Sequence, residues 1–392
     1  MKQHPETLAA RAGIDTDTAH GAVVPPVYLS STFTFEDYGK PRRYDYTRSG
    51  NPTRDVLAET LARLEEGAAG IVTATGMAAI TTVLQLLEPD DLLVAPHDCY
   101  GGTWRLFTAL ARKRCFRVRL IDFNDTKARA AAFAEHPKIT WLETPSNPLL
   151  RITDIRVVAN EAYAAGSIVV VDNTFLSPAL QKPITLGADV VVHSTTKYLN
   201  GHSDVVGGAI VCRDEKLHAD LSWWANCLGV TGAPFDSFLT LRGIRTLRPR
   251  MQAHESNAHA VADLLSRHAA VARVHYPGLV SHPGHDIAKR QQQGFGAMVS
   301  FELNDGEAVV RAFLDGLRCF SLAESLGGVE SLIVHPATMT HAAMTPDARR
   351  EAGITDTLLR LSVGIEHADD LCADILDALD RAQAVTARRK RA

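Results

Sequence analysis

The sequence has few cysteines and a small net charge. Its 392 residues include six cysteines, none in a Cys-x-x-Cys pair. Neither a structural zinc site nor a disulfide framework is therefore predicted. The formal net charge of -4 gives no reason to expect nucleic acid or a membrane surface as a partner.

Long apolar runs are missing as well. No run in the chain is long enough to span a bilayer. Residues 1–12 carry charges and lack the apolar core of a signal peptide. We therefore expect a soluble cytoplasmic protein.

Two glycine fingerprints and one metal motif are also absent. Residues 70–80 read as a strand, a tight turn and a helix start, but contain neither Gly-x-Gly-x-x-Gly nor Gly-x-x-x-x-Gly-Lys. This absence counts against an NAD-dependent oxidoreductase, which would share the alternating strand and helix pattern. The histidines show no His-Glu-x-x-His or comparable spacing, so we predict no metal site.

The composition that remains supports a large folded core. Hydrophobic residues make up 46% and charged residues 22%, and the length exceeds that of one average domain. We predict three parts: an irregular segment (1–60) that contacts a neighbouring subunit, a large domain (61–255) and a smaller C-terminal domain (256–392).

Short apolar runs alternate with helical patterns from about residue 55 onwards. Five of these runs end in polar or reactive positions, at Gly76, Tyr100, Asn147, Asp172 and Lys197. Ligands of an open parallel sheet bind at the carboxyl ends of its strands. The pattern therefore predicts one binding site that draws on all five ends.

Lys197 is the centre of this predicted site. It follows the apolar run 190–192 and three hydroxyl residues, 194–196. A lysine that is partly desolvated loses proton affinity, so its amine becomes a nucleophile suited to a Schiff base. A lone lysine after a strand is as a rule a surface residue, and only the neighbouring strand ends favour the chemical interpretation.

Other candidates also have an ordinary structural explanation. Tyr100 has a ring that could stack on a planar ligand or simply pack in a loop. Arg360 carries a planar fork suited to a carboxylate, although a surface salt bridge would use the same residue. Glu324 and Ser325 precede a glycine pair in a stretch of similar interest.

Taken together, these motifs resemble the trans-sulfuration family of pyridoxal-phosphate (PLP) enzymes over nearly the whole chain. The motifs that carry the resemblance are Tyr46–Arg54, Gly76–Met77, Tyr100–Gly102, Pro145–Pro148, Val171–Thr174, Ser194–His202 and Ala323–Gly328. The resemblance implies an α/β fold of the aspartate-aminotransferase type (fold type I). Its large domain would hold a mainly parallel seven-stranded sheet, beside a smaller α/β C-terminal domain. It also implies a homotetramer made of two active dimers.

The resemblance further implies a role for each matching residue. Lys197 would hold the cofactor and move protons, Asp172 would pair with its ring nitrogen, and Tyr100 would stack on the ring and assist catalysis. Residues implied to hold the phosphate are Gly76, Met77, Ser194 and Thr196, with Tyr46 and Arg48 from the neighbouring subunit. Residues implied to bind small amino-acid substrates are Asp45, Arg105, Asn147, Glu324, Ser325 and Arg360.

Two positions bear on the reaction. Glu324 before Ser325 resembles family members that act at the γ carbon, and Gly102 replaces the cysteine typical of methionine γ-elimination. The resemblance thus implies a transferase that joins O-succinyl-L-homoserine and L-cysteine into L-cystathionine. γ-Elimination of cystathionine to cysteine, 2-oxobutyrate and ammonia stays open as the alternative, as main or side activity. A catalytically silent scaffold that only binds the cofactor is the third possibility.

Overall fold

The computed structural model describes residues 3–342 and 344–389. Met1 and Lys2, part of the segment in which no signal peptide is expected, lie outside them. Within the described ranges, no helix is long and apolar enough to cross a membrane.

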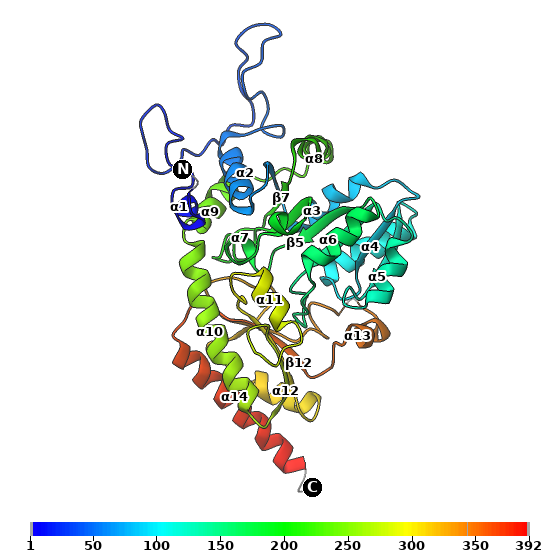
Figure 1. Ribbon diagram of the computed structural model, residues 1–392. Coiled ribbons are helices and arrows are strands. Elements are labelled where there is room, and N and C mark those ends of the chain that lie inside the picture. Colours follow the sequence, from blue (N-terminus) through cyan, green and yellow to red (C-terminus); the bar gives the residue numbers. More distant parts are fainter. Residues whose placement is uncertain (1–2, 343, 390–392) are drawn as a thin grey trace.

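A seven-stranded sheet forms the centre of the larger part of the molecule (Figure 1). Its spatial order is β1-β7-β6-β5-β4-β2-β3, and only β7 runs antiparallel to its neighbours. The predicted mainly parallel sheet is thereby confirmed. Its strands are β1 (Ala69–Thr73), β2 (Leu92–Pro96), β3 (Arg117–Ile121), β4 (Ile139–Glu143), β5 (Ile168–Asp172), β6 (Val190–Ser194) and β7 (Gly208–Cys212).

A smaller five-stranded sheet, in the order β10-β11-β12-β9-β8, builds the C-terminal part. Every pair in it is antiparallel except β10 with β11. Its strands are β8 (Val271–His275), β9 (Met298–Leu303), β10 (Ser321–Leu322), β11 (Leu332–Val334) and β12 (Leu358–Ser362). This sheet agrees with the smaller domain that was expected.

Helices cover both sheets. Those up to the end of the large sheet are α1 (Pro5–Ala10), α2 (Pro52–Glu65), α3 (Gly76–Val83), α4 (Gly101–Arg112), α5 (Thr126–Phe133), α6 (Ile155–Ala164) and α7 (Ser177–Leu180), with short 3-10 turns η1 (Leu84–Leu86) and η2 (Pro183–Leu186). Those that follow are α8 (Glu215–Leu228), α9 (Pro234–Ile244), α10 (Leu247–Arg267), α11 (His285–Gln291), α12 (Glu307–Leu314), α13 (Pro346–Ala352) and α14 (Ala368–Arg389).

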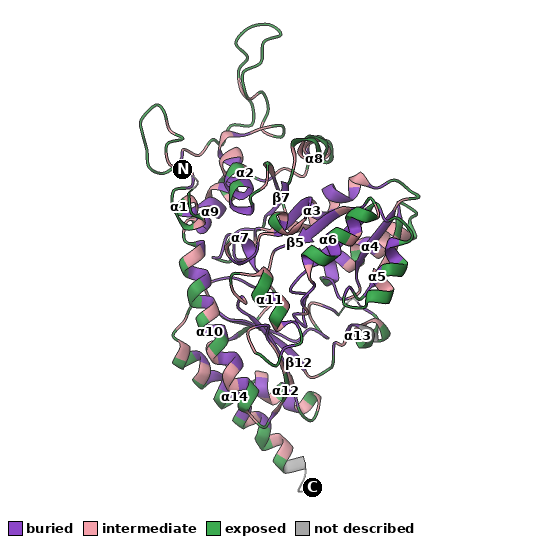
Figure 2. Ribbon diagram, in the orientation of Figure 1, coloured by how far each residue is buried: buried purple, intermediate pink, exposed green. Residues whose placement is uncertain are grey.

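The large sheet is buried on both faces, which explains why its strands read as continuous apolar runs. Val169 and Val171 of β5 belong to one buried cluster and Val170, between them, to another. The first cluster continues through α10 into the small sheet, where it includes Phe301 and Leu359. Both sheets therefore share one continuous core, seen as the purple interior in Figure 2.

Helices, rather than linkers, join the predicted parts. The boundaries that the sequence suggests after residues 60 and 255 fall inside α2 and α10. In Figure 1, α10 runs along the body from the large sheet to the small one. The division into three parts stays a prediction.

An N-terminal arm, residues 16–50, projects from the body (Figure 1). Isolated bridges, Thr32 with Tyr46 and Asp37 with Lys40, fold its outer part back on itself. Most of the arm is solvent-exposed in the single chain (Figure 2). Of the segment 1–60 that was predicted to be irregular, the described residues between α1 and α2 are so, whereas α1 and the first turns of α2, from Pro52 onwards, are helical.

Candidate active site

A cavity of about 410 Å³ lies where the carboxyl ends of the parallel strands meet the small sheet. It is lined by eleven of the predicted residues: Gly76, Met77, Tyr100, Asn147, Asp172, Ser194, Thr196, Lys197, Glu324, Ser325 and Arg360. The fold therefore brings together all five strand ends that the sequence singled out. It adds three residues from the C-terminal part.

Lys197 sits in the turn that follows β6, half-buried in this cavity. Its Nζ donates to Ser325 Oγ at 2.8 Å. The pKa of the Lys197 amine is lowered to about 8, chiefly by burial and also by the positive charge of Arg360, while the charge of Glu324 opposes the change. At pH 7 a pKa of about 8 leaves roughly a tenth of this amine uncharged, far more than for an ordinary lysine, and the uncharged form is the nucleophile.

Ser325 forms hydrogen bonds with Lys197 of the large domain and with Arg360 of the C-terminal part, and its backbone conformation is unusual. Its φ of 99° lies in the left-handed region, which non-glycine residues rarely adopt. Its hydroxyl accepts from Lys197, while its backbone oxygen accepts from Arg360 Nη2 at 3.0 Å. Such strained residues concentrate at functional sites, and this one connects the two cations of the cavity.

Asp172 ends β5 as a carboxylate at the floor of the cavity. One of its oxygens accepts from the backbone N–H of Thr174 at 3.0 Å. Burial raises the pKa of Asp172, whereas hydrogen bonds from Thr174 and the charge of His193 lower it. A carboxylate in this position fits the protonated ring nitrogen of PLP.

The N-terminal end of α3, which lines the cavity through Gly76 and Met77, suits a phosphate. Helix α3 begins at Gly76, with the Thr75 hydroxyl accepting from the Ala78 N–H at 2.9 Å as its cap. A Cβ at position 76 would lie 2.8 Å from Cβ of Ser194, so only glycine lets the two segments approach this closely. The helix N-terminus and the nearby hydroxyls favour an anion.

Arg360, on β12, is buried and lacks a carboxylate partner among the described residues. Its Nη1 donates to Asn147 Oδ1 at 2.7 Å and its Nη2 to Ser325. Its Nε is buried and has no hydrogen-bond partner within the described ranges. Burial lowers the pKa of this guanidinium to about 10. A substrate carboxylate would satisfy the free donor and restore charge balance.

Tyr100 is 42% exposed and its ring lines the cavity. Its backbone N–H donates to Glu143 Oε2 at 2.9 Å, which ties the tyrosine to the end of β4. A Cβ at Gly102 would lie 2.5 Å from Cε1 of the Tyr100 ring. Gly102 therefore leaves room for the ring position seen here.

Replacing Gly102 with cysteine is expected to displace the Tyr100 ring and lower kcat/KM about tenfold, because overpacking of this kind costs roughly 1–3 kcal/mol. Steady-state rates on the proposed substrates would measure the effect. Ala111→Cys, which adds a thiol elsewhere on α4, is the matched control and should behave like the wild type. Equal rates for Gly102→Cys and wild type would contradict this reading of Gly102.

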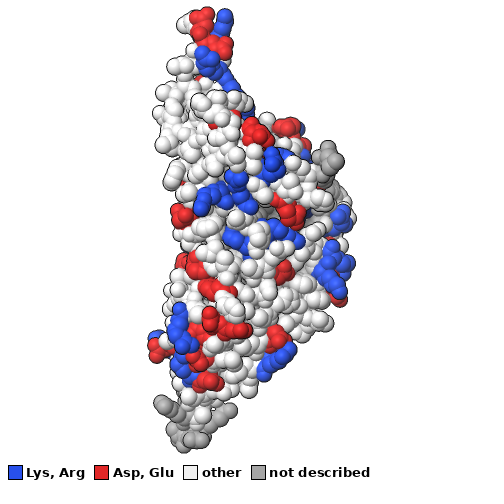
Figure 3. All heavy atoms as spheres, turned by 90° about the vertical axis from the view of Figure 1, so that its left-hand side faces the viewer, with Lys and Arg blue, Asp and Glu red and all other residues white. Residues whose placement is uncertain are grey.

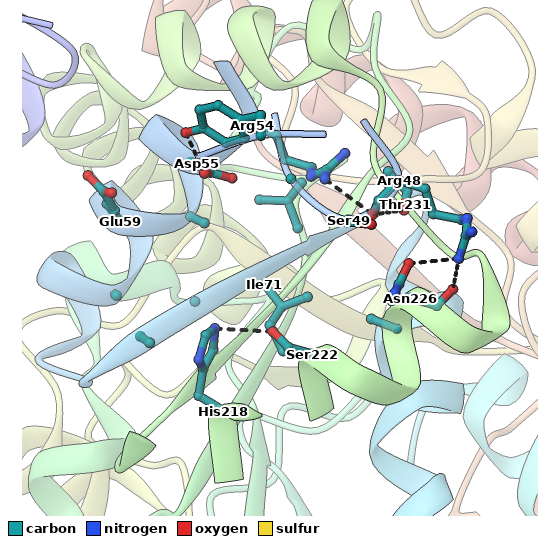
Figure 4. A pocket seen from close by; sticks show the side chains of 18 of the residues that line it. Arg48, Ser49, Arg54, Asp55, Glu59, Ile71, His218, Ser222, Asn226 and Thr231 are labelled. Carbon is teal, nitrogen blue, oxygen red and sulfur yellow. Dashed lines mark hydrogen bonds between the residues drawn. The ribbon is translucent and has the colours of Figure 1, made fainter. Parts of the chain in front are cut away.

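Four predicted residues lie elsewhere in the single chain. Asp45 and Arg48 line a second cavity of about 640 Å³, shown in Figure 4, where Arg48 Nη1 donates to the backbone oxygen and side chain of Asn226 at 2.9 and 2.8 Å. Tyr46 is 48% exposed on the arm. Arg105 is exposed on α4 and does not line the first cavity. Any role of these four near the cofactor needs a second chain or a different side-chain position.

Two ionisable residues that line the cavity were not among the predicted site residues. Glu143 ends β4 opposite Asp172, and burial and the Asp172 charge raise the pKa of its carboxyl. His193 lines the cavity from β6. The rule that selects Asp172, a charged residue closing an apolar run, would also have found Glu143.

The residues present thus fit PLP: an amine of lowered pKa, a buried carboxylate for the ring nitrogen, a helix N-terminus for the phosphate and an aromatic ring beside them. Within residues 3–342 and 344–389, no group of three or more histidine, cysteine, aspartate or glutamate side chains is arranged to hold a metal ion.

Comparison with known proteins points the same way. A family model described as Cys/Met metabolism PLP-dependent enzyme matches residues 6–380. The chain is 55% identical over 376 residues to cystathionine gamma-synthase of Escherichia coli (strain K12), covering 96% of this chain and 97% of that protein. It is 47% identical over 376 residues to a cystathionine beta-lyase of Lactococcus lactis subsp. cremoris, covering 96% and 99%.

One solved structure resembles this chain over nearly its whole length. Cystathionine gamma synthase from Xanthomonas oryzae pv. oryzae, in complex with aminoacrylate and cysteine, matches with a TM-score of 0.97 and 62% identity. The match covers 98% of this chain and 100% of that one.

Proposed function

Because the chain belongs to the family of Cys/Met metabolism PLP-dependent enzymes, we propose that it joins O-succinyl-L-homoserine and L-cysteine into L-cystathionine, with release of succinate. This γ-replacement would serve methionine biosynthesis. The relatives named cystathionine gamma-synthase support the choice within the family.

One observation of the site carries the proposal. Lys197 and Arg360 meet at Ser325, the first through its hydroxyl and the second through its backbone oxygen. An amino acid whose carboxylate binds Arg360 would thus have its carbon chain beside the amine of Lys197. A proton-transfer group next to a carboxylate site is what chemistry on an α-amino acid requires.

PLP, when bound, withdraws electrons from the substrate carbon skeleton. Asp172 would pair with its ring nitrogen, Tyr100 would lie against the ring, and Gly76, Met77, Ser194 and Thr196 would hold its phosphate. Asn147, Glu324 and Ser325 align the substrate that Arg360 holds. Lys197 removes protons from the α and then the β carbon and returns them later.

The proposed γ-replacement needs no oxidant or reductant. The bond between the γ carbon and the succinyl oxygen breaks, and the cysteine sulfur forms a new bond to that carbon. The thiol proton is released with succinate. Asp45 and Arg105 are proposed to receive the incoming or leaving group.

The assembly proposed is a homotetramer of two active dimers, in which Tyr46 and Arg48 serve the neighbouring subunit's cavity. The N-terminal arm supports this, because it exposes large apolar side chains: Val23, Val24, Tyr28, Leu29, Phe35 and Tyr38, the last fully exposed at 100%. Figure 3 shows the projecting part largely free of charge below its charged tip. Such a surface is typical of a subunit contact. The cytoplasm is the proposed location.

Paired initial rates test the function. Purified protein with PLP receives O-succinyl-L-homoserine plus L-cysteine in one reaction and L-cystathionine alone in another. Cystathionine, 2-oxobutyrate and pyruvate are quantified in both. We expect cystathionine formation in the first reaction to exceed keto-acid release in the second by at least about tenfold, as differential stabilisation of about 1.4 kcal/mol would give.

The other outcomes each overturn the assignment in a defined way. Dominant 2-oxobutyrate and cysteine from cystathionine would identify γ-elimination, and dominant pyruvate would identify β-elimination. No turnover in either reaction, with the cofactor bound, would leave a scaffold that binds PLP only.

A further inference from the structure

A buried carboxylate lies two residues before Tyr100 and has no role in the site described above. Asp98 belongs to the turn between β2 and α4, and its side chain is 6% exposed. Its Oδ2 accepts from Ser146 Oγ at 2.7 Å and from Arg151 Nη1 at 3.0 Å. None of these three is among the described residues that line the cavity. The Asp98–Ser146–Arg151 cluster therefore lies outside the cavity, next in the chain to residues that line it.

Ser146 connects the cluster to Asn147. Its backbone N–H donates to the Arg151 oxygen at 3.0 Å. Its hydroxyl donates to Asp98 and accepts from the backbone N–H of Arg151 at 3.3 Å. The loop from Ser146 to Arg151 is thereby closed on itself and held to Asp98. Asn147, the next residue in this loop, is buried and accepts from Arg360 Nη1 at 2.7 Å.

Arg151 connects the cluster to the C-terminal part. Besides Asp98, its Nη1 contacts Nε2 of His97 at 3.0 Å, and Nδ1 of that imidazole lies 3.2 Å from the Ile121 oxygen at the end of β3. Nη2 of the same arginine donates to the Ala352 oxygen at 3.1 Å. Ala352 is the last residue of α13, and the end of a helix favours a positive charge. The carboxylate of Asp98 thus neutralises an arginine that spans both parts of the molecule.

The contacts of Arg360 explain why this cluster matters for binding. Among the described residues, its guanidinium donates to two groups only, Asn147 Oδ1 and the backbone oxygen of Ser325. Asn147 therefore supplies one of the two contacts that set the direction of the planar fork. A fork binds a carboxylate well only in the right plane. A small displacement of Asn147 would therefore weaken the carboxylate site.

We propose that Asp98 is a positioning residue for binding of the substrate α-carboxylate. Through Ser146 it holds Asn147, which in turn directs Arg360. Through Arg151 it ties the same loop to the C-terminal part, from which Arg360 reaches the cavity. The inference rests on the carboxylate role proposed for Arg360, and it is independent of the side chain that the amino-acid substrate carries.

The test is Asp98→Asn, which keeps the size of the side chain but removes its charge. Ser146→Ala, which removes the hydroxyl, and the double variant complete a cycle. Asp263→Asn is the matched control, because Asp263 pairs with Arg267 at 2.6 Å on the solvent-exposed side of α10.

Two small ligands separate carboxylate binding from general damage to the site. Each protein, loaded with PLP, is titrated at one pH with glycine and with methylamine, which lacks the carboxylate. The absorption of the bound cofactor reports both dissociation constants. The dissociation constant of PLP itself and the steady-state kcat and KM are measured beside them.

The dissociation constant of glycine should rise about tenfold in Asp98→Asn, because the loop that holds Asn147 loses a charge-assisted hydrogen bond. Methylamine and PLP should bind with nearly the wild-type affinity. KM should rise while kcat stays close to the wild-type value, because the carboxylate does not react. The double variant should bind glycine no more weakly than Asp98→Asn alone, since both changes break the same contact. Asp263→Asn should match the wild type throughout.

Unchanged glycine affinity in a folded Asp98→Asn protein would overturn the proposal. Equal weakening of glycine, methylamine and PLP would overturn it too, because the cluster would then support the fold alone. Independent effects of the two single changes would exclude the path through Ser146. If Asp98→Asn fails to fold, Ser146→Ala is read by the same criteria. A wild-type protein that binds glycine no better than methylamine would instead contradict the proposed function.

Discussion

Lys197→Ala is expected to lower kcat by at least about a thousandfold, because the variant loses both the group that attaches the cofactor and the group that transfers protons. The Lys197 amine has its pKa lowered to about 8 in the cavity and donates to Ser325 Oγ. Every proton transfer proposed between the α, β and γ carbons depends on it. Among the residues that the structure describes, no other lysine lines this cavity.

Binding and chemistry can be separated in this experiment. Asp172, Gly76 and Ser194 remain in the variant, so reversible binding of PLP should persist. Borohydride reduction should attach the cofactor to the wild-type chain and fail to attach it to Lys197→Ala. Lys127→Ala, an exposed residue on α5, is the control for loss of a lysine. Turnover close to the wild-type rate in Lys197→Ala would refute the mechanism.

Arg360→Lys is expected to lower kcat/KM by about a hundredfold, equivalent to about 2.7 kcal/mol. Lysine keeps the charge but lacks the planar fork, which here donates to Asn147 and Ser325 while leaving Nε for a ligand. We expect KM to change more than kcat, because the lost contact is to a carboxylate that does not react.

A substrate analogue without the α-carboxylate sharpens this experiment. The wild type should favour the complete substrate strongly, whereas Arg360→Lys should discriminate far less. Arg311→Lys, on the exposed face of α12, controls for an arginine-to-lysine change outside the site. If Arg360→Lys retained the wild-type discrimination, the carboxylate would have to bind elsewhere.

Local sequence patterns determined most of the strands and their ends. The strand, turn and helix start predicted over residues 70–80 correspond to β1 and α3, and the apolar run 190–192 lies within β6. Such elements are readable because apolar runs and glycine or proline breaks act over a few residues. The prediction missed β3 and β7. The second of these inserts antiparallel between β1 and β6, a pairing that no local pattern specifies.

By itself, the sequence determined which residues stand at the strand ends, and therefore that Lys197, Asp172 and Tyr100 would meet at one edge of a sheet. Tertiary structure alone decided what surrounds them. Arg360 reaches Asn147 across 213 positions, and Glu65 reaches His193 across 128. These contacts depend on how remote helices and sheets pack and on which polar groups lose water, and neither property is encoded in any short stretch of chain.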